Sequence, residues 1–401
     1  MSDKCVLAFS GGLDTSVCVA WLRENHGYDV VALTVDVGQG AELEGLEVRA
    51  EAAGVSELVV VDAREEFVTG FCWPALRANA LYEGRYPLVS ALSRPLIASH
   101  LVRVARETGA TAIAHGCTGK GNDQVRFETS IAALGPDLTV HAPIRETGMQ
   151  RDQALAYAAE RGIPVVATKE KPYSVDENLW GRAIESGVLE DPWTAPPDKD
   201  VYEFTLSPQE APDEPAEVVI GFEAGLPVSV DGEAIGPVEI VRLMQELAGR
   251  HGVGRIDMIE NRLVGIKSRE VYEVPASLAL ITAHRDLEDL VLERDLAHFK
   301  QSVELRYAEL VYNGLWFSPL KRSLDAFVDS TQDAVTGEVR LRLHKGTARP
   351  TGRRSERALY SPELATYGSE GDAFRHDAAA GFITLWSLPV RVWAQRGGAG
   401  S

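Results

Sequence analysis

The chain has 401 residues, of which 45% are hydrophobic and 25% are charged. This length and apolar content suffice for two or three globular domains and exclude wholesale disorder. Forty lysine and arginine residues against 59 aspartate and glutamate residues leave a net charge of −19. Such a surface repels nucleic acids and anionic membranes, so any phosphate-bearing ligand must be held by a local site.

Neither secretion nor a membrane span is indicated. The N-terminal residues lack a basic stretch followed by an apolar core, and no apolar run approaches the ~18 residues that span a bilayer. The cysteines show no CxxC pair and no zinc-like spacing, standing at Cys5, Cys18, Cys72 and Cys117. We therefore expect a cytoplasmic protein with reduced thiols and no metal held directly by a cluster of side chains.

The first ~165 residues alternate short β-branched runs with amphipathic helical stretches, which predicts an α/β fold with a parallel sheet covered by helices. Strands are expected at residues 6–9, 30–35, 58–61, 111–114 and 139–141. Helical spacing of apolar residues occurs at 43–53 and 92–105.

A different architecture is expected from about residue 170, because prolines accumulate between Pro192 and Pro237 and the alternation stops. The expected elements are a hairpin around Asp231-Gly232, helices over 238–248 and 286–313, and a strand over 337–344. This pattern predicts an α+β domain with antiparallel strands.

The sharpest motif, Ala8-Phe-Ser-Gly-Gly-Leu-Asp-Thr-Ser16, follows the first expected strand and runs into a helix. Gly11 and Gly12 allow a tight turn close to a ligand, and the helix start offers unpaired N–H groups to an anion. Asp14 is acidic at this position, which favours a metal ion bridging phosphates. The alternative is a plain turn in which Asp14 or Ser10 caps the helix. The motif matches neither the Walker A loop nor the dinucleotide fingerprint.

A second glycine-rich turn, within His115 to Glu128, follows the fourth expected strand and again leads into a helix. Ligands of parallel sheets bind at the carboxyl ends of the strands. Asn122 and Arg126 share a helix face, and Thr118 and Asp123 can line the same crevice. Glycines beside opposite charges favour a binding loop over a solvated, capped helix start.

The first loop resembles the pyrophosphate loop of the N-type ATP pyrophosphatases, which cleave ATP between the α and β phosphates. Together, the two loops resemble the argininosuccinate synthase family, and the similarity spans nearly the whole chain. Further stretches carry it at residues 83–87, 174–179, 251–262, 265–269, 271–275 and 309–312.

This resemblance implies an adenine nucleotide α hydrolase-like ATP-binding domain over 1–168, a synthetase domain over 169–362 and an oligomerisation tail over 363–401. The implied activity, in arginine biosynthesis, is an ATP-dependent ligation of L-citrulline and L-aspartate to argininosuccinate. The ureido oxygen of citrulline attacks the α-phosphorus and releases pyrophosphate, after which the aspartate amine displaces AMP. The implied assembly is a homotetramer without nucleic-acid or membrane partners. Magnesium comes with ATP, and no organic cofactor is tightly bound.

The resemblance also implies roles for individual residues. ATP is expected to contact Ala8, Phe9, Ser10, Gly11, Gly12, Leu13, Asp14, Thr15, Ser16, Val35 and Gly116. Aspartate is expected at Thr118, Asn122 and Asp123. Citrulline is expected at Tyr86, Asn122, Arg126, Ser174, Ala183, Glu260 and Tyr272, although many relatives have a serine at the position of Ala183. Catalytic roles fall to Asp14, Asn122, Asp123 and Arg126.

Several of these residues have plainer interpretations. Tyr86 and Tyr272 fit half-buried tyrosines with satisfied hydroxyls, and Ser174 fits the cap of an expected helix. His115 fits a packed loop residue better than a proton carrier. A basic stretch over 345–357 is typical of a solvated face or a subunit contact, and it contains Arg349, Arg353, Arg354 and Arg357.

Two rival functions stay open at this level. A tRNA thiolase or lysidine synthase shares the pyrophosphatase loop, but it needs a basic RNA surface or catalytic cysteines. A regulatory module could keep the fold and bind ATP without turnover. The polar residues at positions 14, 122, 123 and 126 favour an enzyme.

Overall fold

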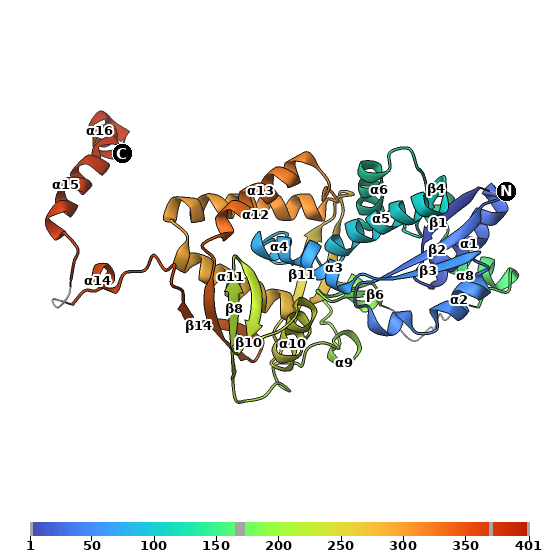
Figure 1. Ribbon diagram of the computed structural model, residues 1–401, viewed down its shortest axis with the longest axis horizontal. Helices are drawn as coiled ribbons and strands as arrows, with labels where there is room; N and C mark the ends of the chain where they lie inside the picture. The colour runs from blue at the N-terminus through green and yellow to red at the C-terminus, as the bar shows by residue number, and fades with distance from the viewer. Residues whose placement is uncertain (1–2, 165–172, 369–371, 399–401) are drawn as a thin grey trace. The chain divides into compact units, whose positions relative to one another are not determined.

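The computed structural model of the protein describes residues 3–164, 173–368 and 372–398 (Figure 1). The chain separates into two compact units, residues 1–357 and 358–401. The expected boundary between residues 168 and 169 lies outside the described residues.

The N-terminal sheet is parallel throughout and has the strand order β3-β2-β1-β4-β5. Its strands are β1 (Lys4–Ala8), β2 (Asp29–Asp36), β3 (Glu57–Asp62), β4 (Ala112–Ala114) and β5 (Thr139–His141). All five expected strands are confirmed, as is the α/β fold. The order reverses between β1 and β4, and such a reversal is where open α/β sheets bind ligands.

Helices cover both faces of this sheet, because alternate residues of each strand point to opposite sides (Figure 1). On one face Leu7 packs with α1 (Leu13–His26), α2 (Leu46–Ala53) and α8 (Arg151–Glu160). On the other face Val6 packs with α5 (Val89–Thr108) and α6 (Asp123–Leu134). The helical stretches expected at 43–53 and 92–105 correspond to α2 and α5.

Two antiparallel sheets follow, which confirms the expected α+β architecture. The five-stranded sheet has the order β10-β9-β8-β13-β14, with strands Glu233–Ala234, Leu226–Val230, Ala216–Glu223, Gly337–His344 and Thr347–Arg354. The four-stranded sheet has the order β11-β12-β7-β6, with strands Arg255–Asn261, Lys267–Glu273, Gly181–Glu185 and Ser174–Asn178. The expected hairpin, the helix α10 (Pro237–Arg250) and the strand at 337–344 are all present.

The single long helix expected over 286–313 is wrong. The structure has two helices there, α11 (Pro275–Val291) and α12 (Arg294–Tyr312). The Glu293 side chain accepts hydrogen bonds from the backbone N–H groups of Asp295 and Leu296 and so caps α12. Apolar spacing continues across the break because both helices pack on the same core.

Shorter elements connect these parts. The α-helices are α3 (Arg64–Phe67), α4 (Trp73–Arg77), α7 (Pro143–Thr147), α9 (Asp198–Val201) and α13 (Pro319–Gln332). Single turns of other helix types are η1 (Gly40–Leu43), η2 (Val68–Cys72) and η3 (Gly187–Glu190). No helix in the described part of the chain has the length and apolar character required to cross a bilayer.

The C-terminal unit contains α14 (Pro362–Ala365), α15 (His376–Trp386), α16 (Leu388–Trp393) and η4 (Ala394–Gly398). Its large apolar side chains are exposed: Trp386 is 72% exposed and Trp393 is 57% exposed. Exposed aromatic patches of this kind are typical of interaction surfaces.

Candidate active site

The two glycine-rich loops meet at the point where the strand order of the parallel sheet reverses. One loop follows β1 and leads into α1, and the other follows β4, which pairs directly with β1. Between these loops and the four-stranded sheet lies a cavity of about 510 Å³. Its position agrees with the general rule for ligand sites in open α/β sheets.

The turn after β1 presents backbone and hydroxyl groups to this cavity. Gly11 has a left-handed backbone with φ of +74°, as the expected tight turn requires. The N-cap residue of α1 is Gly12, and no side chain caps the helix. The structure therefore does not show Asp14 or Ser10 in the capping role, and the first N–H groups of α1 remain available to an anion.

Asp14 lies in the first turn of α1 and lines the cavity. Burial raises the pKa of its carboxyl group, and the positive charge of Arg151 acts in the opposite direction. A partly desolvated carboxylate beside free N–H groups is stabilised by a cation.

Most of the residues expected to contact ATP line the same cavity: Ala8, Phe9, Ser10, Asp14, Thr15, Val35 and Gly116. Gly11, Gly12, Leu13 and Ser16 are not in its wall. The first three form the turn and the helix start, and Ser16 is buried.

The second loop brings all four of its expected polar residues to the cavity, namely Thr118, Asn122, Asp123 and Arg126. Asp123 lies between two guanidinium groups. Its Oδ2 accepts from Arg94 Nη2 at 2.8 Å, and its Oδ1 accepts from Arg126 Nη1 at 2.9 Å. Although burial acts to raise the pKa of Asp123, the charges of Arg94 and Arg126 hold it below its usual value.

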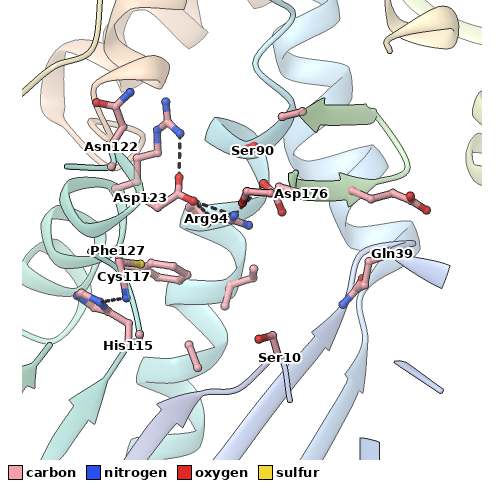
Figure 2. A pocket seen from close by; sticks show the side chains of 18 of the residues that line it. Ser10, Gln39, Ser90, Arg94, His115, Cys117, Asn122, Asp123, Phe127 and Asp176 are labelled. Carbon is pink, nitrogen blue, oxygen red and sulfur yellow. Dashed lines mark hydrogen bonds and ion pairs between the residues drawn. The ribbon is translucent and has the colours of Figure 1, made fainter. Parts of the chain in front are cut away.

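Arg94 extends this charge network to the four-stranded sheet. Its Nη2 also lies 2.7 Å from Oδ2 of Asp176 in β6, and Figure 2 shows Asp123, Arg94 and Asp176 joined across the cavity. Neither Arg94 nor Asp176 was expected at the site from the sequence. A usable signal was present, because Arg94 is the one Asp, Glu, Lys or Arg residue in the first half of α5.

A wall of tyrosine and glutamate side chains faces these loops. The rings of Tyr86 and Tyr272 stack with centroids 4.2 Å apart, and Tyr272 donates to Glu260 at 2.6 Å. Ser174 and Ala183 line the cavity from β6 and β7. The helix expected after Ser174 is wrong, because Ser174 begins a strand paired with β7. All residues expected to contact citrulline therefore lie in the cavity wall.

Two family models match the chain, the Arginosuccinate synthase N-terminal HUP domain over residues 4–164 and the C-terminal domain over residues 173–393. The argininosuccinate synthase of Synechococcus sp. is 58% identical, with 98% of each chain covered. That of Rubrobacter xylanophilus is 58% identical, with 98% of this chain and 95% of the relative covered. That of Thermosynechococcus vestitus is 57% identical, with 98% of each chain covered. The chain belongs to the argininosuccinate synthase family.

A solved structure described as a predicted subunit of tRNA methyltransferase from Methanocaldococcus jannaschii has a low likeness to this family member. It is 14% identical, covers 44% of this chain and 78% of its own, and has a TM-score of 0.29. That similarity bears on no functional assignment.

Next to Glu260, the cavity of this argininosuccinate synthase family member has an acidic corner that was not expected from the sequence. Glu270 and Glu185 share the guanidinium of Arg262, and Ser268 donates to Glu270 at 3.0 Å. Burial, followed by the charge of Glu185, raises the pKa of Glu270. This corner can hold a proton or a cationic group.

His115 lines the cavity but is packed as a loop residue. Its Nδ1 accepts from the backbone N–H of Cys117 at 3.3 Å, which leaves Nε2 to donate to Glu128 at 3.1 Å. The imidazole also stacks on Phe127, with centroids 5.7 Å apart. Both ring nitrogens are therefore engaged, which supports the packing interpretation.

The basic stretch over 345–357 lies outside the cavity wall. Arg353 pairs with Asp286, Arg354 pairs with Glu338, and Arg349 and Arg357 are exposed. This arrangement is that of a solvated, ion-paired strand. In the described ranges, no group of three or more His, Cys, Asp or Glu side chains could hold a metal ion.

Proposed function

We propose that this protein joins L-citrulline and L-aspartate to form argininosuccinate at the expense of ATP, releasing AMP and pyrophosphate. The observation that carries the proposal is the single cavity whose wall contains both loops and the tyrosine and glutamate residues opposite them. Its volume of about 510 Å³ is in the range of small-molecule sites.

The nucleotide occupies the end of the cavity formed by the loop after β1. The free N–H groups at the start of α1 and the hydroxyls of Ser10 and Thr15 bind its phosphates. Magnesium would accompany ATP, and Asp14 is the residue that would help to hold it, where its charge would neutralise the phosphates. This assignment is supported by the absence of a capping side chain at Gly12 and by the burial of the Asp14 carboxyl.

The amino-acid substrates occupy the remainder of the cavity. Thr118, Asn122 and Asp123 bind aspartate, while Tyr86, Arg126 and Glu260 are among the residues that bind citrulline. Carboxylates of the substrates require guanidinium or amide donors, and their ammonium groups require carboxylates. Both kinds of group are present. Ala183 offers no hydroxyl, so citrulline meets only its methyl group and backbone there.

The reaction needs no nucleophilic side chain, because ATP activates the substrate. The ureido oxygen of citrulline attacks the α-phosphorus and pyrophosphate leaves. The aspartate nitrogen then attacks the ureido carbon, the C–O bond breaks, and AMP departs with the former ureido oxygen. Positioning and neutralisation of phosphate charge lower the barrier, which is the role of the groups around Ser10, Asp14 and Arg126.

The wider setting belongs to the same proposal: an ATP-binding domain over 1–168, a synthetase domain over 169–362 and an oligomerisation tail over 363–401, in a cytoplasmic homotetramer. The exposed aromatics of α15 and α16 support a covered position for the tail. Light scattering of the full chain and of a chain ending at Arg357 tests this. Equal oligomeric states would contradict a role of the tail in assembly.

Isotope transfer tests the reaction. With citrulline labelled at the ureido oxygen, plus ATP and aspartate, the label should appear in AMP by mass spectrometry. Unlabelled AMP, or the appearance of ADP, contradicts the mechanism. Pyrophosphate release that depends on RNA instead of citrulline would favour the tRNA-modifying alternative, against which the net charge of −19 already argues.

A further inference from the structure

Tyr312 is a buried residue outside the cavity wall that touches three of the residues placed at the substrates. It is the last residue of α12, and its side chain is fully buried. It contacts Asn122 before α6, Arg126 within α6 and Glu260 in β11. Asn122 and Arg126 lie one helical turn apart, whereas Glu260 follows them by more than a hundred positions.

The hydroxyl of Tyr312 has one consistent arrangement of protons. Asn122 Nδ2 donates to Tyr312 Oη at 2.8 Å, and Tyr312 Oη donates to Glu260 Oε1 at 2.6 Å. The orientation of the Asn122 amide follows from its other end, where Oδ1 accepts from the backbone N–H of Leu263 at 2.9 Å. Burial and the carboxylate of Glu260 raise the pKa of Tyr312, so the hydroxyl keeps its proton.

The rest of Tyr312 holds Arg126. Its carbonyl oxygen accepts from Arg126 Nε at 3.0 Å, and the guanidinium carbon lies 4.9 Å from the centre of its ring. The end of α12 approaches α6 closely at Gly314, where a Cβ atom would lie 2.8 Å from the Cα of Arg126. The ring of Tyr82 also stacks on the ring of Tyr312, with centroids 3.5 Å apart.

We propose that Tyr312 is a positioning residue, which holds Asn122, Arg126 and Glu260 in register for citrulline without touching the substrate itself. The inference rests on the proposed function, because that function places the two amino-acid substrates at these three residues. The hydroxyl keeps Glu260 and the Asn122 amide in one hydrogen-bonded chain, and Tyr272 satisfies the second carboxylate oxygen at 2.6 Å. Loss of the hydroxyl leaves the amide and one carboxylate oxygen free to reorient.

Tyr312→Phe removes the hydroxyl and retains the ring and the carbonyl. We expect the KM for citrulline to rise about tenfold or more, while the KM for ATP changes by less than about twofold. Tyr307→Phe is the matched control, because Tyr307 is a buried tyrosine of the same helix whose hydroxyl bonds Asp325 at 3.0 Å, outside the cavity wall. The control should leave both KM values unchanged, and melting temperatures of both variants check folding.

A second measurement separates action through Glu260 from general loosening. In a Glu260→Gln background, Tyr312→Phe should cause little further loss of kcat/KM for citrulline, because the charged acceptor of the Tyr312 hydroxyl is already gone. The inference would be overturned if the two substitutions caused additive losses of kcat/KM for citrulline. It would also be overturned if Tyr312→Phe alone raised the KM values for citrulline and ATP equally. If the wild-type protein itself shows no citrulline-dependent pyrophosphate release, the proposed function fails instead.

Discussion

Arg94 donates to the same oxygen of Asp123 through both Nε and Nη2, at 2.9 and 2.8 Å. The second donor, Nη2, also reaches Asp176 at 2.7 Å. One side chain of α5 thus joins the start of α6 to strand β6 of another sheet. The guanidinium spans the two parts of the chain that form the cavity, so its loss should affect both stability and catalysis.

Replacement of Arg94 by Met should destabilise the protein by about 2 kcal/mol or more at pH 7, because it leaves Asp123 and Asp176 without this partner. Asp123 has a lowered pKa, whereas an unfolded aspartate titrates near about 3.9. Its ionised form therefore stabilises the fold above that pH, and the contribution is lost as the pH falls through the folded-state pKa. Urea unfolding at several pH values measures the free energy of unfolding of both proteins.

The difference between wild type and Arg94→Met should accordingly shrink below about pH 4. Arg103→Met is the control, because Arg103 is an exposed residue of the same helix paired with Glu107, and pairs of that kind contribute about 0.3–0.5 kcal/mol. A difference that stays constant from neutral to acid pH would show that Arg94 acts by packing and not by charge.

Asp14→Asn should lower the rate of pyrophosphate release by about 100-fold or more while the fold persists, because the amide cannot neutralise a metal ion. Circular dichroism checks the fold, and a coupled pyrophosphate assay checks the rate. The control Asp152→Asn changes a first-turn aspartate of α8 that lies outside the cavity wall, and it should leave the rate of pyrophosphate release unchanged. Near-normal ligation by Asp14→Asn would refute the catalytic assignment.

Arg126→Ala should weaken the binding of citrulline far more than the binding of ATP. A desolvated, charge-assisted pair contributes on the order of 2 kcal/mol, which corresponds to about a 30-fold rise in the KM for citrulline. Steady-state titrations of both substrates measure the KM values for citrulline and ATP in the variant and in the wild type. Arg126 also bonds Asp123 and the carbonyl of Tyr312, so equal losses for ATP and citrulline would mean that it supports the loop and not the ligand.

Lys300→Met should destabilise the protein by about 3–5 kcal/mol, since it removes the cation from a buried cluster with two carboxylates. Lys300 is 1% exposed and lies 3.1 Å from Glu288 and 2.9 Å from Glu304. Denaturant unfolding gives the free energy, and Lys199→Met at an exposed position of α9 is the control. A loss below about 1 kcal/mol would show that the carboxylates find other donors.

The parallel sheet was predictable because its strands are short runs rich in β-branched and apolar residues, each followed closely by a polar residue or a glycine. The break at Glu293 was not, because apolar periodicity runs through it and the cap is a glutamate, a weaker signal than Ser, Thr, Asn or Asp. The helix expected after Ser174 was wrong for a related reason. A residue type typical of helix caps also suits the first position of a strand, and pairing with β7 decided between them.

Local sequence thus determined the two loops at the carboxyl ends of β1 and β4, since a tight turn and a helix start depend on neighbouring residues alone. Family resemblance added the tyrosine and glutamate residues opposite them. Only the tertiary structure decided how these groups engage one another: Arg94 between Asp123 and Asp176, Arg262 between Glu185 and Glu270, and Tyr312 beneath the site. Except for the local pair of Arg262 and Glu270, these contacts join residues far apart in the chain, and a side chain's partner across such a distance is set by how helices and sheets pack.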